Sequence, residues 1–78
     1  MKPKGPRIFI VAEHGLGARA CADSLGLEPH TWYYVWDSKM LEGLGQDAMV
    51  ILAEHWRRHP CVDEISAAFR GLRTVEVV

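Results

Sequence analysis

Apolar residues in this chain form short runs separated by glycine, proline and charged residues. Residues 7–12 and the run within 47–53 show no polar alternation, which is typical of strands covered on both faces of a parallel sheet. Residues 31–36 are rich in aromatic and β-branched side chains and predict another strand. Residues 74–78 alternate between the two faces, as an edge strand does. The pattern therefore predicts four strands.

Residues with helical spacing lie between these strands. The first predicted helix runs from Ala18 to Leu25, and Gly26 is a natural residue to end it. A short second helix is expected after the second strand, where Asp37 or Ser38 can cap it. A third helix begins near residue 60 and continues through apolar positions spaced at intervals of three and four.

Strands that alternate with helices, in the order β-α-β-α-β-α-β, predict a small open parallel sheet with right-handed crossovers. The most economical strand order is 2-1-3-4, a truncated flavodoxin-like or Rossmann-like α/β arrangement. The first helix then covers one face, and the other two cover the opposite face. We expect an apolar patch on the first face, over the third and fourth strands. Self-association or a partner would bury it, unless the sheet's own side chains and the tail do so.

The composition describes one small domain, residues 7–78, preceded by a flexible tail at residues 1–6. The 78 residues are 49% apolar and 24% charged, with a net charge of −1. This charge disfavours nucleic acid and anionic membranes as partners. Apolar runs are far shorter than the roughly 18–20 residues that span a bilayer. The two cysteines, expected on opposite sheet faces, predict no disulfide, and we expect a cytoplasmic protein.

Ligands of open parallel sheets gather beyond the carboxyl ends of the strands, where the strand order reverses. The first and third predicted strands end in the same triplet, Ala-Glu-His, and the second ends at Asp-Ser. The sequence therefore predicts one rim that holds the candidate ligand-binding residues: Glu13, His14, Gly15, Gly17, Asp37, Ser38, Glu54 and His55. A solvated rim without a ligand is the competing interpretation.

The turn after the first strand carries a glycine pattern of its own. Residues 15–20 fit G-x-G-x-x-G/A, and Asp37 follows Gly17 by 20 residues. In dinucleotide-binding proteins such glycines let the backbone approach a pyrophosphate, and the acid binds a ribose. His14 and Leu16 are bulky for a phosphate cradle, and the chain lacks a second half for a nicotinamide. A dehydrogenase is nearly excluded, and binding of a phosphate or mononucleotide is an alternative function.

Metal binding and cysteine catalysis have less support. His55 and His59 are four residues apart, but Pro60 biases His59 away from helical geometry. Cys61 near a helix N-terminus could be a nucleophile, although packing under Trp56 is the favoured interpretation. A rim metal site is conceivable from His14, His55 and either Glu13 or Glu54. No residue pattern in the chain indicates a catalytic residue, a metal or a cofactor, and an enzyme is disfavoured.

The segment Trp56, Arg57, Arg58 and His59 predicts recognition of a partner. Tryptophan and arginine dominate protein interfaces, so this segment favours binding of another protein or of a second copy. The same side chains could stack on bases and pair with phosphates, which leaves weak nucleic-acid binding as a second alternative. We therefore predict a small non-enzymatic binding module.

The frame of the chain resembles a group of short proteins encoded by actinobacterial phages. The resemblance spans residues 7 to about 73 and rests on residues 8–12, 25–29, 32–35, 37, 41–44, 56–58 and 63–65. To our knowledge this group has no assigned activity. The resemblance implies a small accessory protein that acts by protein–protein interaction in the cytosol of an infected bacterium.

Overall fold

The computed structural model describes residues 7–45 and 47–77. The predicted tail, residues 1–6, and the last residue of the predicted fourth strand lie outside the described residues. The elements in chain order are β1 (Arg7–Val11), α1 (Gly15–Ser24), β2 (Trp32–Tyr34), the 3-10 turn η1 (Ser38–Leu41), β3 (Ala48–Leu52), the 3-10 turn η2 (Trp56–Arg58), α2 (Val62–Ala68) and β4 (Arg73–Glu76).

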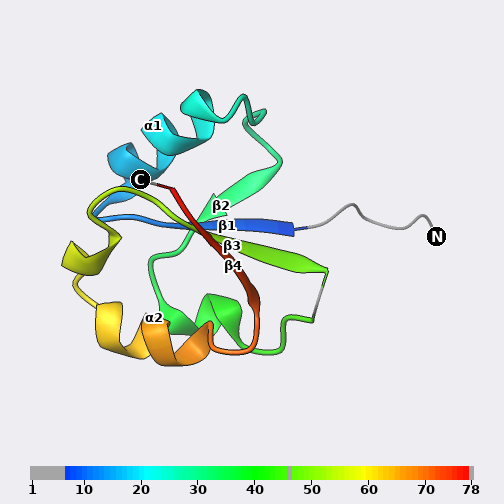
Figure 1. Ribbon diagram of the computed structural model, residues 1–78, viewed down its shortest axis with the longest axis vertical. Helices are drawn as coiled ribbons and strands as arrows, with labels where there is room; N and C mark the ends of the chain where they lie inside the picture. Colours follow the sequence, from blue (N-terminus) through cyan, green and yellow to red (C-terminus); the bar gives the residue numbers. More distant parts are fainter. Residues whose placement is uncertain (1–6, 46, 78) are drawn as a thin grey trace.

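The four strands form one parallel sheet in the order β2-β1-β3-β4, which confirms the predicted order (Figure 1). Ile10 of β1 pairs with Tyr34 on one side and with Ile51 on the other. Ile51 in turn pairs with Val75 of β4. Because all strands run in the same direction, their carboxyl ends lie along one edge of the sheet, called the carboxyl edge below.

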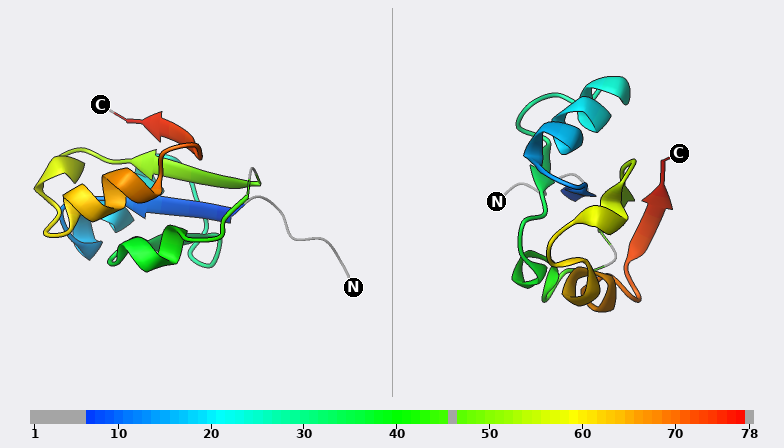
Figure 2. Two further views of the ribbon diagram at one scale, coloured as in Figure 1. Left: turned by 90° about the horizontal axis from the view of Figure 1, so that it is seen from below. Right: turned by 90° about the vertical axis from the view of Figure 1, so that its left-hand side faces the viewer.

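Each face of the sheet packs against its own core. α1 covers one face, while η1, η2 and α2 lie on the other, as the sequence predicted (Figure 2). On the α2 face, Phe9, Val11, Val50 and Leu52 of the sheet pack with Leu41, Trp56 and Ile65. On the α1 face, Ile10 and Ile51 pack with Ala18 and Ala22. The small alanines let α1 lie close to the strands.

The two cysteines follow this division. Cys21 packs against the core on the α1 face, and Cys61 packs against the core on the α2 face. Both thiols are free and partly buried. Their separation by the sheet is the arrangement that the sequence predicted.

Local boundaries differ from the prediction in several places, three of which concern the elements around the carboxyl edge. α1 begins at Gly15 instead of Ala18, because His14 caps it: the Gly17 N–H donates to His14 Nδ1 over 3.3 Å. The expected second helix is a single 3-10 turn, which Asp37 caps through Lys39 N–H at 3.0 Å. β2 spans three residues instead of six. Gly26 does end the first helix, with the left-handed φ of 74° expected at that position.

The apolar patch expected over β3 and β4 is only partly exposed. α1 packs against β1 and β2. Ile51 is nevertheless buried, and Met49 and Val77 are half-buried. Val75 remains 46% exposed, so the uncovered area of this face centres on the edge strand β4.

Within residues 7–45 and 47–77, no helix combines the length and apolar character needed to cross a membrane. α1 has ten residues, about half of the ~20 that a crossing requires.

Candidate functional site

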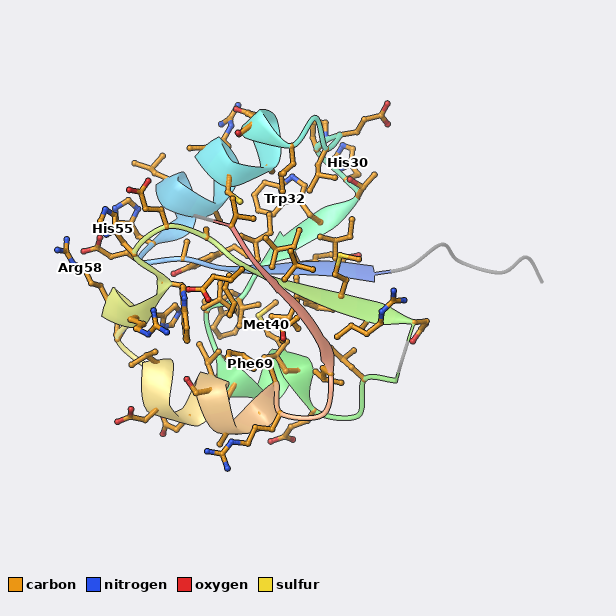
Figure 3. The ribbon with its side chains drawn as sticks, viewed as in Figure 1. His30, Trp32, Met40, His55, Arg58 and Phe69 are labelled. Atoms are coloured by element: carbon orange, nitrogen blue, oxygen red, sulfur yellow. The ribbon has the colours of Figure 1, made fainter. Side chains whose placement is uncertain are left out.

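The parallel sheet brings the predicted rim residues to one edge. Val35 N–H donates to Ile10 O at 2.9 Å, and Ala53 N–H donates to Val11 O at the same distance. The chain segments that leave β1, β2 and β3 are therefore neighbours at the carboxyl edge. Figure 3 shows His55 and Arg58 at this edge and His30 at the opposite end of the sheet. The predicted shared location is confirmed, whereas ligand binding there stays a prediction.

The glycine turn after β1 has a structural role in this fold. The Gly17 amide, a donor that a bound phosphate would need, is already bonded to His14 Nδ1. A Cβ at Gly17 would lie 3.5 Å from the Ala12 side chain, so this position sets the close approach of α1 to β1. Asp37, the predicted ribose ligand, caps η1. Three of the candidate ligand-binding residues, His14, Gly17 and Asp37, thus hold local structure.

The turn after β3 is built around an unusual backbone conformation. His55 has φ 65°, the left-handed region, and it is the one non-glycine residue with positive φ in residues 7–45 and 47–77. Such a conformation costs on the order of 1 kcal/mol for a residue with a Cβ. Trp56 N–H donates to Ala53 O at 3.1 Å and closes the turn. The exposed His55 side chain places Nε2 3.6 Å from the Glu54 carboxylate.

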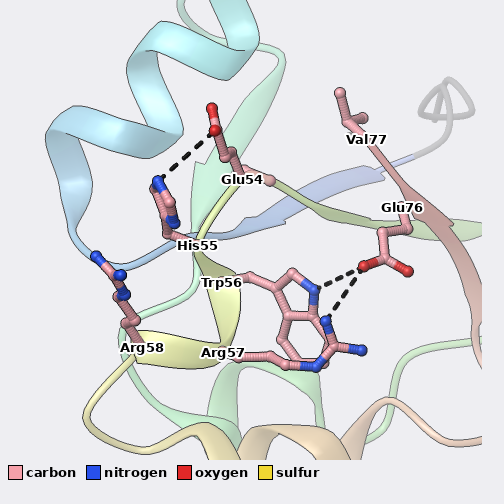
Figure 4. A pocket seen from close by; sticks show the side chains of 8 residues that line it. Glu54, His55, Trp56, Arg57, Arg58, Glu76 and Val77 are labelled. Carbon is pink, nitrogen blue, oxygen red and sulfur yellow. Dashed lines mark hydrogen bonds and ion pairs between the residues drawn. The ribbon is translucent and has the colours of Figure 1, made fainter.

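Trp56, Arg57 and Glu76 form a contact cluster next to this turn, called the Trp56–Arg57–Glu76 cluster below (Figure 4). Trp56 Nε1 donates to Glu76 Oε2 at 3.2 Å, and an Arg57 guanidinium nitrogen lies 3.5 Å from the same oxygen. The Arg57 guanidinium also lies 4.6 Å from the Trp56 ring centroid, a cation–π distance. Phe69 contacts the indole edge-on, with centroids 5.8 Å apart.

A pocket of about 300 Å³ adjoins the Trp56–Arg57–Glu76 cluster. Ala53 and Val77 contribute apolar walls, and Glu54, His55 and Arg58 contribute polar ones. The pocket lies where the ends of β3 and β4 meet the loop that contains η2 (Figure 4).

His59 is buried, which corrects its prediction as a residue exposed to a partner. It is 4% exposed and both ring nitrogens are occupied. Nδ1 accepts from Cys61 N–H at 2.9 Å, and Nε2 lies 2.8 Å from the Val35 carbonyl oxygen. A carbonyl only accepts, so Nε2 carries the proton and the ring is neutral. His59 ties the loop to the end of β2 and has no nitrogen left to join His55 on a metal.

Trp56 is likewise an interior residue, 9% exposed. Its indole packs on the α2-face core, where Ile65 and Phe69 lie. Of the four residues predicted to contact a partner, Arg57 and Arg58 are the exposed ones. Trp56 and His59 support them from beneath.

Burial raises the pKa of one cysteine and of one tyrosine side chain above the ordinary value. Burial raises the pKa of the Cys21 thiol, which disfavours the nucleophilic thiolate. Burial, and secondarily the neighbouring Cys61 thiolate, raises the pKa of Tyr34. Among the residues that the structure describes, no three histidine, cysteine, aspartate or glutamate side chains are grouped closely enough to hold a metal ion.

Three residues at this edge, Leu16, Trp36 and Glu76, were not predicted as site residues from the sequence. Glu76 accepts from Trp56 although twenty residues separate them. The alternation of β4 was the available signal, because it placed Glu76 on the face opposite Val75, where α2 lies. Leu16 and Trp36 were missed as exposed apolar side chains, at 76% and 63% exposure. They follow β1 and β2 and therefore belong to the same edge.

The exposed part of the edge offers hydrogen-bond donors beside apolar surface. The Arg57 side chain is 72% exposed even though its guanidinium contacts both Trp56 and Glu76. Arg58 is exposed and has no ion-pair partner among the described residues.

Comparisons with protein-family models, with curated proteins and with solved structures found no match to this chain.

Proposed function

We propose that this protein is a small non-enzymatic binding module that recognises a protein partner through its carboxyl edge, with Arg57 and Arg58 as the main contact residues. The observation that carries the proposal is the position of Arg57. Its guanidinium is stacked on a buried tryptophan and held by Glu76, yet most of its side chain is exposed. Arginine in such a setting is a common energetic centre of protein interfaces.

Pre-organisation supports this role. An exposed arginine ordinarily loses rotamer entropy when a partner immobilises it, at about 0.5–1.5 kcal/mol per side chain. Arg57 has lost part of this freedom in the free protein, because the indole and the carboxylate already fix it. The Trp56 anchor is itself held by Glu76 and Phe69, and the His59 hydrogen bonds hold the following residues. The loop is therefore built as a rigid platform.

Apolar surface at the same edge gives a second reason. Leu16 and Trp36 are the two most exposed large apolar side chains of the described residues. They follow β1 and β2, and the arginines follow β3, so the segments after three neighbouring strands combine apolar and donor groups. Protein interfaces have this mixed character, with aromatic residues and arginine enriched.

The alternative ligands fit less well. The Gly17 amide and the Asp37 carboxylate already have intramolecular partners, which removes groups that a nucleotide would use. Nucleic acid binding draws on several unpaired basic groups. In this loop Glu76 offsets the charge of Arg57, so that of the two loop arginines only Arg58 lacks an ion-pair partner among the described residues. These observations favour a protein over a nucleotide or a nucleic acid.

The experiment compares proteins retained by immobilised wild type and by single variants. We expect Arg57→Ala and Arg58→Ala each to reduce retention of a specific partner about tenfold, the loss of one interface contact worth about 1.4 kcal/mol. Retained proteins are identified by mass spectrometry, and the affinity of the purified partner is measured by calorimetry. Both side chains are exposed, so neither change removes a buried side chain. Arg57→Ala also removes the contacts with Trp56 and Glu76, whereas Arg58→Ala removes neither.

Arg70→Ala is the matched control. Arg70 is exposed and precedes β4, so it lies toward the opposite end of the sheet and carries the same charge change. Partner retention should be unchanged in this variant. Equal retention by all variants, or retention only of nucleic acid that high salt releases, would contradict the proposal.

The resemblance to actinobacterial phage proteins guides the choice of lysate. On that resemblance we propose an accessory role in the cytosol of an infected actinobacterium, and such a host is the first source of partners to test. Free, partly buried cysteines are compatible with a reducing compartment.

A further inference from the structure

β4 is an edge strand whose outer side is free among the described residues. It pairs with β3 on one side only, and all four of its residues are exposed. Val77 N–H donates to Leu52 O at 2.9 Å, which shows which backbone groups point toward β3. Because backbone groups alternate along a strand, those of Thr74 and Glu76 point away from the sheet. They are available to another strand.

The outward backbone groups of β4 can form hydrogen bonds with the same groups of a second β4 that is related to the first by a two-fold rotation. We propose that β4 pairs antiparallel with β4 of a second copy of this chain, with Val75 at the two-fold axis. In this register Thr74 of each copy faces Glu76 of the other copy. The two residues that point outward exchange backbone hydrogen bonds in both directions, and the two sheets become one continuous sheet. This contact goes beyond the proposed function, because it uses the edge strand and not the loop.

Side chains favour this register over its neighbours. A pair centred on Glu76 would place two carboxylates opposite each other, which is unfavourable. A pair centred on Val75 places Glu76 opposite the Thr74 hydroxyl and Arg73 opposite Val77. The charged residues, which ordinarily protect an edge strand, then meet neutral or hydrogen-bonding side chains. Arg57 lies 3.5 Å from the Glu76 carboxylate and further offsets its charge.

The same arrangement covers the exposed apolar surface of this face. Val75 is 46% exposed in the single chain and would contact its own counterpart across the axis. Met49 and Val77, which α1 does not fully cover, lie on the same face beside it. A second copy therefore satisfies both the free backbone groups and the uncovered apolar side chains, and it does so with one interface.

The first test is the concentration dependence of the molar mass, measured by sedimentation equilibrium from about 10 µM to about 1 mM, the range of a weak interface. We expect a monomer–dimer equilibrium for the wild type. Val75→Lys places two ammonium groups opposite each other and should leave only monomer. Thr74→Lys places a lysine opposite Glu76 of the other copy and should tighten the dimer severalfold.

The second test fixes the register by cross-linking. Val75→Cys places two cysteines in a non-hydrogen-bonded antiparallel pair, with Cα atoms about 4.5 Å apart, within the range of a disulfide. With oxidised glutathione as the oxidant, this variant should form a covalent dimer. Thr74→Cys carries the same native cysteines, but its new cysteine faces position 76 of the other copy, so this variant should form no covalent dimer.

Circular dichroism of Val75→Lys distinguishes loss of the interface from loss of the fold. If Val75→Lys unfolds, cross-linking of Val75→Cys tests the interface instead. The proposal is overturned by a wild type that is monomeric throughout, by equal cross-linking of the two cysteine variants, or by a folded Val75→Lys that dimerises like the wild type. A wild type that stays monomeric but binds an extended foreign peptide at β4 also overturns it. Loss of the arginine-dependent partner, by contrast, leaves the dimer unaffected.

Discussion

The same tripeptide, Ala-Glu-His, leaves two neighbouring strands of this sheet and adopts two different structures. After β1, His14 is extended, with φ −158°, and its ring caps α1, which begins at the next residue. After β3, His55 is left-handed, with φ 65°, and a 3-10 turn follows before α2 begins seven residues later, at Val62. The residues that follow each triplet make the difference, because the second segment must bury Trp56 and His59.

The comparison teaches how a binding surface can arise on an otherwise ordinary sheet edge. In the turn after β1, the His14 side chain caps α1, and Gly17 lets the chain lie close to the strand. In the turn after β3, buried side chains anchor the loop to the core, and Arg57 and Arg58 stay exposed. A strained turn that persists needs such anchors, since the surrounding contacts must offset its cost.

The largest expected effect comes from His59→Ala, which removes the anchor of the second turn. The change removes the hydrogen-bond partner of the buried Val35 carbonyl and that of the partly buried Cys61 amide. We expect the free energy of unfolding, measured by chemical denaturation, to fall by about 3 kcal/mol. His30→Ala, at an exposed position, is the control and should change stability little. Similar losses in both variants would mean that His59 is not an anchor.

A smaller effect of opposite sign separates the two triplets directly. His55→Gly relieves a left-handed residue and should raise the free energy of unfolding by roughly 0.5–1 kcal/mol. His14→Gly removes the α1 cap and should lower it by a few tenths of a kcal/mol. Thermal and denaturant unfolding of the two variants test this. A change of the same sign at both positions would show that the backbone difference has no energetic consequence.

The smallest effect concerns Tyr34, which lies between the two turns. Its ring is 5.9 Å from that of His59, and a Cβ at Gly15 would lie 3.9 Å from it. Burial, and then the Cys61 thiolate, raises the pKa of Tyr34 above its ordinary value of 10.0. The folded state therefore holds this proton more tightly than the unfolded state. Its stabilising contribution is present at neutral pH and is lost as the pH rises beyond 10.0.

Denaturant unfolding between about pH 9 and pH 11 measures this loss. The wild type should lose more stability over this range than Tyr34→Phe, which has no phenol to ionise. Cys61→Ser should show an intermediate loss, because it removes the thiolate but keeps the burial. Parallel pH profiles for the wild type and Tyr34→Phe would rule out a contribution from Tyr34.

The repeated triplet also marks where sequence-based inference stopped. Its position at the ends of two strands predicted a common edge, and the parallel sheet confirms that location. The G-x-G-x-x-A pattern offered a phosphate cradle as an alternative, and in the structure Gly17 packs on Ala12 and its amide is capped. A short glycine motif indicates a flexible backbone with small side chains. Close packing of a helix on a strand requires these properties, and so does a phosphate-binding turn.

By itself, the sequence determined the strands, their parallel order and the faces that the helices cover, because hydrophobic periodicity and chain connectivity leave few arrangements. Only the tertiary structure decided that His59 turns inward, that His55 is left-handed and that Glu76 holds both Trp56 and Arg57. These features depend on contacts between residues far apart in the chain. No local sequence pattern predicts such contacts, because two distant residues interact only after the sheet has brought them together.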